Sequence, residues 1–167
     1  MDADLNKIYS WYCDASWIVD EMANTHKRFA DLADDLTADA KANNGRISIK
    51  ALQAITKAIA TTKSNFTDSL PEQKVPEYGP AFLARQLQKW FDNIDRLHTS
   101  YLKAVATGDY NEKETGEMLI DIIASFAKEA KSIGDAQTSM FKRKYAADKK
   151  ELEELLSYMD DFSRLVK

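Results

Sequence analysis

The 167-residue chain has little of what marks several common classes of small protein: it holds one cysteine, three prolines and five glycines. The single thiol, Cys13, cannot form an internal disulfide, which excludes a disulfide-stapled scaffold and is typical of a reducing compartment. With 44% hydrophobic and 30% charged residues, the composition also excludes collagen-like and disordered chains. The first residues lack the basic and apolar segments of a secretion signal, so we expect a cytoplasmic protein.

Long hydrophobic runs are missing as well. The most apolar stretch, residues 118–127, is interrupted by Asp121 and falls short of the roughly 18 apolar residues that a membrane-spanning helix needs. The net charge of −4 disfavours an overall affinity for nucleic acid or for anionic membranes. We therefore expect neither an integral membrane protein nor a nucleic-acid-binding protein.

Side chains that carry catalytic chemistry are scarce. The chain has two histidines, and Asp95-x-x-His98 is the one carboxylate and histidine pair with the spacing used in di-iron bundles, which need several such groups. Gly-rich phosphate loops, Cys-x-x-Cys pairs and recognisable nucleophile–base arrangements are absent from the sequence. We predict no enzymatic activity, no metal or cofactor site and no small-molecule substrate. A less favoured alternative is a small-molecule sensor or enzyme built in the bundle core, for which the polar candidates are His26, Thr62, Gln137 and Asp148.

Helix-breaking residues divide the chain. All three prolines fall in residues 71–80, which cannot form continuous helix and are predicted to be a linker. Asn43-Asn44-Gly45 and Thr107-Gly108-Asp109 give two more breaks. Ser48 and Asn111 are suited to cap the helices that follow these breaks. The sequence thus predicts helices at about residues 2–41, 48–70, 80–107 and 112–165.

Hydrophobic periodicity predicts how these helices pack. In the first helix, apolar positions alternate spacings of three and four, as in a coiled coil: Leu5, Ile8, Tyr12, Ala15, Val19, Met22, His26, Phe29, Ala33 and Leu36. Similar stripes run through the other three segments. We predict a single all-α domain over residues 1–167, an elongated antiparallel four-helix bundle with a long C-terminal helix. A break near Gly134 or residues 142–150 would instead fold the chain back as a fifth helix.

The predicted helices differ greatly in length, at roughly 60, 33, 42 and 80 Å. The first and last helices should therefore extend past the middle two as a two-helix stalk, which is rich in aromatic residues. Two helices cannot bury so many rings, and exposed apolar patches usually mark an interface. The predicted partner-binding residues are Tyr9, Trp11, Trp17, Tyr158 and Phe162. The alternative is that these rings belong to a monomeric core.

A basic segment near the end of the last predicted helix is the clearest charge feature. Its predicted anion-contacting residues are Lys142, Arg143, Lys149 and Lys150, with Phe141 and Tyr145 interleaved as apolar or stacking contacts. An acidic block follows directly, so a self-compensated solvent-facing surface is the competing interpretation. Residues 1–45 hold nine acidic against four basic residues, and this acidic segment is a possible counterpart of the basic one.

The sequence therefore predicts a non-enzymatic protein–protein interaction or assembly module. It would act through the aromatic face of the first helix and the end of the last helix, binding a second copy or another protein. The alternative prediction is a peripheral membrane-binding or granule-binding helical protein that uses residues 142–150.

Overall fold

The computed structural model describes the backbone of residues 3–68, 80–109 and 111–152, and the side chains of residues 15–66, 83, 85–109 and 111–147. Four helices make up this part of the chain: α1 (Ala3–Ala42), α2 (Ile49–Asp68), α3 (Pro80–Thr107) and α4 (Glu112–Leu152). The prediction of an all-α helical bundle is confirmed, and the expected boundaries agree to within two residues wherever the chain is described. The predicted extension of the last helix to residue 165 lies outside the described residues.

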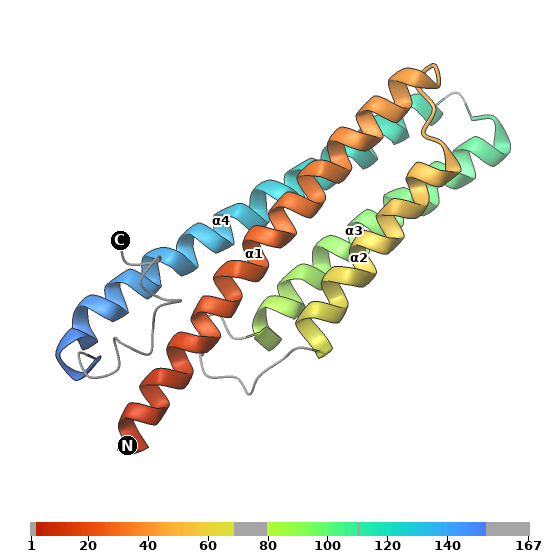
Figure 1. Ribbon diagram of the computed structural model, residues 1–167. Coiled ribbons are helices and arrows are strands. Elements are labelled where there is room, and N and C mark those ends of the chain that lie inside the picture. Colours follow the sequence, from red (N-terminus) through yellow and green to blue (C-terminus); the bar gives the residue numbers. More distant parts are fainter. Residues whose placement is uncertain (1–2, 69–79, 110, 153–167) are drawn as a thin grey trace.

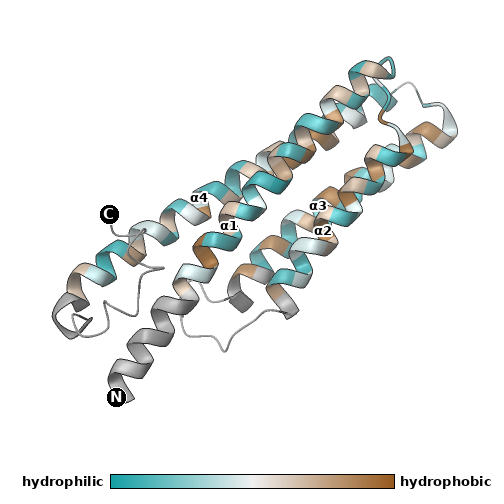
Figure 2. Ribbon diagram, viewed as in Figure 1, coloured by the Kyte–Doolittle hydropathy of each residue, from teal (hydrophilic) through white to brown (hydrophobic). Residues whose placement is uncertain are grey.

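The helices run up, down, up and down, so that each is antiparallel to the next (Figure 1). α1 packs most extensively along α4, α3 packs against α4, and α2 packs against both α1 and α3. The molecule is thus a long α1–α4 pair covered over part of its length by a shorter α2–α3 pair. Figure 2 shows hydrophobic and hydrophilic segments alternating along the helices, as one-sided burial requires.

The two pairs differ in length. α1 and α4 have 40 and 41 residues, whereas α2 and α3 have 20 and 28. At 1.5 Å per residue these are roughly 60, 62, 30 and 42 Å. α1 and α4 therefore continue together beyond the ends of α2 and α3, opposite the α1–α2 turn (Figure 1). We call this extension, residues 3–14 of α1 and 141–152 of α4, the arm.

α1 is buried along two stripes because it has two neighbours. The predicted stripe is confirmed by the burial of Ala15, Met22, Phe29, Ala33 and Leu36. A second stripe, on the side of α2, is also buried and consists of Ile18, Thr25 and Leu32. The heptad pattern identifies only the first stripe.

Aromatic rings fill the centre of the four-helix section. Phe29 of α1, Phe91 of α3 and Phe126 of α4 are each at most 2% exposed. The ring of Phe126 lies 4.6 Å from that of Phe29 and 5.3 Å from that of Phe91, both in edge-to-face geometry. This cluster joins three helices and places the core well away from the arm.

α4 is continuous from Glu112 to Leu152, so the alternative of a fifth helix formed by a break near Gly134 or residues 142–150 is wrong. The physical reason is packing along α1. A Cβ atom at Gly134 would lie 3.2 Å from the Cβ of Met22, so this glycine allows α1 and α4 to approach closely. Gln137 and Phe141, one and two turns further on, are fully buried and continue the same stripe.

Candidate functional site

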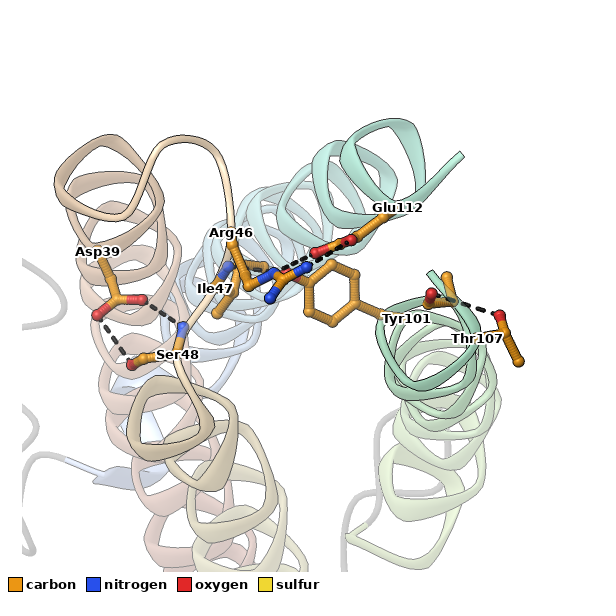
Figure 3. Close-up of polar contacts among 8 residues, drawn as sticks. Asp39, Arg46, Ile47, Ser48, Tyr101, Thr107 and Glu112 are labelled. Atoms are coloured by element: carbon orange, nitrogen blue, oxygen red, sulfur yellow. Dashed lines mark hydrogen bonds and ion pairs between the residues drawn. The ribbon is translucent and has the colours of Figure 1, made fainter. Parts of the chain in front are cut away.

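The end of the bundle opposite the arm, which we call the closed end, is held by a network that begins at the α1–α2 turn (Figure 3). Asp39 of α1 accepts hydrogen bonds from the backbone N–H of Ser48 at 2.7 Å and from its hydroxyl at 3.0 Å. The Ser48 hydroxyl oxygen in turn accepts the Ala51 N–H at 3.2 Å. The predicted cap at Ser48 is confirmed, and Asp39 adds a negative charge where the α2 dipole favours one.

Tyr101 of α3 connects this turn to the rest of the bundle. Its side chain is fully buried, and its hydroxyl oxygen accepts the buried N–H of Ile47 at 2.8 Å (Figure 3). A Cβ atom at Gly116 of α4 would lie 3.0 Å from the ring, so α4 presents a glycine where the ring needs space. Burial raises the pKa of the Tyr101 phenol, which therefore stays neutral near pH 7.

Arg46 and Glu112 form a two-pronged ion pair across the closed end, with N–O distances of 2.5 and 3.0 Å. The Arg46 side chain remains 58% exposed, so solvent weakens the pair and its contribution to stability is small. An open cleft of about 520 Å³ beside the pair is lined by Asn43, Asn44, Gly45, Arg46, Asp109, Glu112 and Lys113. Acidic and basic groups balance in this lining, which indicates a structural junction and gives no preference for a charged ligand.

A second polar cluster lies between α1 and α2. Asn65 donates to the Glu21 carboxylate at 2.8 Å, and Arg28 donates to the Thr62 hydroxyl at 2.7 Å. Glu21 is only 8% exposed, and Thr62 also donates to the Ala58 carbonyl oxygen at 2.9 Å. These buried polar groups satisfy one another, so they fix the register of α2 on α1. Of these four residues, only Thr62 was predicted from the sequence. Glu21 and Arg28 are seven residues apart, which places both on one side of α1 and could have indicated a shared polar site.

The two histidines occupy separate places. His26 Nδ1 lies 2.8 Å from the Ala127 carbonyl oxygen, and because a carbonyl only accepts, this nitrogen carries the proton. His98 is half-buried on α3, and burial lowers its pKa although Asp95 opposes the shift. Within the described residues, no group of three or more His, Cys, Asp or Glu side chains could hold a metal ion.

Gln137 differs from the other buried polar groups. It is fully buried on α4, and neither its amide nitrogen nor its amide oxygen has a hydrogen-bond partner among the described residues. An unpaired buried amide is costly, so this position lowers stability relative to an apolar residue. The side chain of Asp148, the remaining predicted polar candidate, lies outside the described part of the chain.

Among the predicted partner-binding residues, the structure describes the side chain of Trp17 alone. Tyr9 and Trp11 lie on α1 in the arm, but their side chains are outside the described set, as are Tyr158 and Phe162 altogether. Trp17 is half-buried and packs edge-on against Phe66 of α2, with ring centroids 5.5 Å apart. Trp17 therefore belongs to the four-helix section, where α2 covers part of its ring. A partner-binding role of Trp17 stays a prediction for the part of the indole that remains accessible.

The structure describes only some of the side chains of the basic segment at residues 142–150. Lys142 and Arg143 are exposed on α4, whereas the side chains of Lys149 and Lys150 are not described. The expectation that Phe141 supplies an apolar or stacking contact beside the basic residues is wrong, because Phe141 is fully buried in the stripe that faces α1. Tyr145 is half-buried. The segment thus offers exposed charge without the interleaved phenylalanine that the sequence suggested.

Comparisons of the chain with family models, with curated proteins and with solved structures found no match. In the part of the chain that the structure describes, no helix has a segment long and apolar enough to cross a bilayer. The distinguishing feature of the described molecule is its unequal helix pairs, which create the arm.

Proposed function

We propose that the protein is a non-enzymatic assembly module whose arm binds a protein partner, with a second copy of the chain as the expected partner. The observation that supports this proposal is the extension of α1 and α4 beyond α2 and α3 (Figure 1). A helix in the four-helix section has two neighbours, whereas the described backbone of the arm extends past both α2 and α3.

The sequence of the arm adds to this support. Tyr9 and Trp11 are two residues apart, which places their positions about 200° apart around α1. At most one of the two positions can therefore face α4. Large aromatic residues are enriched at the centres of protein interfaces, where they contribute much of the binding energy. A second copy is a natural partner because most soluble oligomers are symmetric assemblies of one chain.

Size-exclusion chromatography with light scattering over a series of concentrations tests the proposal. We expect a discrete oligomer that dissociates on dilution, and we expect the double variant Tyr9→Ala/Trp11→Ala to be monomeric with an unchanged helical circular dichroism spectrum. Leu102→Ala is the matched control, because Leu102 is 44% exposed on α3 in the four-helix section. A wild-type chain that stays monomeric at every concentration would contradict self-association through the arm.

The alternative function, anion or membrane contact through residues 142–150, receives less support. Lys142 and Arg143 are exposed there, but Phe141 is buried and cannot act as an apolar contact. The segment also lies on the arm, so the oligomer proposed above would place it near a protein interface.

A further inference from the structure

The α2–α3 pair carries charge opposite to that of α1. Seven basic residues lie on α2 and α3 against three acidic ones, whereas α1 carries eight acidic and four basic residues. Residues 112–135 of α4, which lie in the four-helix section, add six acidic against three basic residues. The net charge of the chain conceals this separation into a basic layer and an acidic layer.

Six of the basic side chains are exposed. Along α3, the four positions 85, 89, 96 and 103 fall within about 40° around the helix, on the side opposite the buried Ile94. On α2, positions 50 and 57 are seven residues apart and share one side. We call this surface the α2–α3 face, defined by Lys50, Lys57, Arg85, Lys89, Arg96 and Lys103.

Basic charge exceeds acidic charge on the α2–α3 face, most clearly along α3. Within the described residues, none of its six basic side chains forms an ion pair. Asp92 lies in the same stripe, between Lys89 and Arg96, and its negative charge offsets one of the six positive charges. Asp31 and Asp35 of α1 line a shallow cleft together with Lys57, so the positive charge on α2 is partly offset, whereas α3 packs mainly against α4 and α2. An approaching anionic surface therefore meets mainly the basic side chains.

Exposed apolar side chains accompany this charge. Three large hydrophobic residues are exposed in the described part of the chain, and two of them, Ile49 at 73% and Leu102 at 44%, lie on α2 and α3. Ile49 and Leu102 are the sequence neighbours of Lys50 and Lys103, so each lies about 100° around its helix from that lysine, at the edge of the α2–α3 face. Basic side chains beside exposed aliphatic ones suit the interfacial zone of an anionic bilayer, which takes up both.

We propose that the α2–α3 face binds the surface of an anionic lipid membrane. The acidic surface of a second copy would match the charge of this face, but it would leave Ile49 and Leu102 without an apolar environment. The basic segment at residues 142–150 is a weaker candidate, because an acidic block adjoins it in sequence. The proposal is independent of the arm and extends beyond its role in assembly.

Vesicle flotation of the full chain tests this inference. The probes are vesicles with about 30% phosphatidylserine in phosphatidylcholine and vesicles of phosphatidylcholine alone, at about 0.05 and 0.5 M NaCl. We expect flotation with the anionic vesicles at low salt, a loss of at least about tenfold at high salt, and none with the neutral vesicles.

Two variants with the same change in charge locate the contact. Lys89→Glu/Arg96→Glu alters the α2–α3 face, and Lys142→Glu/Arg143→Glu alters the arm by the same residue types and the same total charge. All four side chains are exposed, so both variants should fold, and circular dichroism checks this. We expect the first variant to lose flotation and the second to retain most of it. A further variant, Leu102→Ser, should reduce flotation without any change of charge.

Several outcomes would overturn the proposal. Wild-type protein that does not float with anionic vesicles at low salt contradicts it directly. Equal losses in both charge variants would assign binding to total charge, and a loss only in the Lys142/Arg143 variant would place the contact on the arm. A further outcome is that the protein does not float but associates with itself in a salt-sensitive way, and that Lys89→Glu/Arg96→Glu abolishes this association. That result would show that the α2–α3 face binds a second copy of the chain.

Discussion

At the scale of single residues, Tyr101 has a role that its apolar spacing alone does not indicate. It is a buried ring in the stripe of α3, and its hydroxyl oxygen is also the acceptor for the N–H of Ile47 in the α1–α2 turn. Because Ile47 is buried as well, no solvent replaces that acceptor when it is removed.

Tyr101→Phe should therefore lower the free energy of unfolding by about 1–3 kcal/mol, because it leaves a buried N–H unpaired while keeping the ring. Urea denaturation followed by circular dichroism measures the change. Arg46→Gln is the comparison, since it breaks a solvent-exposed ion pair at the same end and should have the smaller effect. A larger effect of Arg46→Gln than of Tyr101→Phe would refute this account of the closed end.

Gln137 leads to a prediction of the opposite sign. Its amide is buried without a partner among the described residues, so Gln137→Leu should raise the free energy of unfolding by about 1–3 kcal/mol. The same denaturation experiment applies, with Gln53→Leu as a control at an exposed position of α2 that should change little. Lower stability of Gln137→Leu would show that the amide is hydrogen-bonded in solution.

At the scale of helices, the close approach of α1 and α4 depends on Gly134. Even a Cβ atom there would lie 3.2 Å from the Cβ of Met22, so Gly134→Leu forces the helices apart. We expect a loss of about 1–3 kcal/mol from overpacking, measured by thermal or urea denaturation. Ala136→Leu, two residues further along α4 at an exposed position, should leave stability nearly unchanged. Equal effects at both positions would mean that the contact with Met22 is not tight.

The helices themselves were largely predictable, but their surroundings were not. The prolines at residues 71–80 and the turns at Gly45 and Gly108 act locally, so the helix boundaries follow from the sequence. A heptad pattern, however, indicates one partner for each helix. Since α1 has two, the stripe containing Ile18 and the covered position of Trp17 could not be read from it.

At the scale of the whole molecule, the unequal helix pairs separate two surfaces. The arm lies beyond the ends of α2 and α3, whereas the α2–α3 face consists of exposed residues of the shorter pair. The two proposals can therefore fail independently. Tyr9→Ala/Trp11→Ala should change the oligomeric mass while leaving vesicle flotation intact, and Lys89→Glu/Arg96→Glu should do the reverse. A variant that changes both properties would indicate that assembly and membrane contact are coupled.

By itself, the amino-acid sequence determined the all-α class, the four helices and the unequal lengths that produce the arm. These properties depend on local physics: helix breakers, caps and the 3.6-residue period act on neighbouring positions. The tertiary structure alone decided which distant groups meet, including Tyr101 with Ile47, Asn65 with Glu21, and the six basic side chains of the α2–α3 face. Such contacts depend on the order and register in which helices pack, and no single helix encodes these.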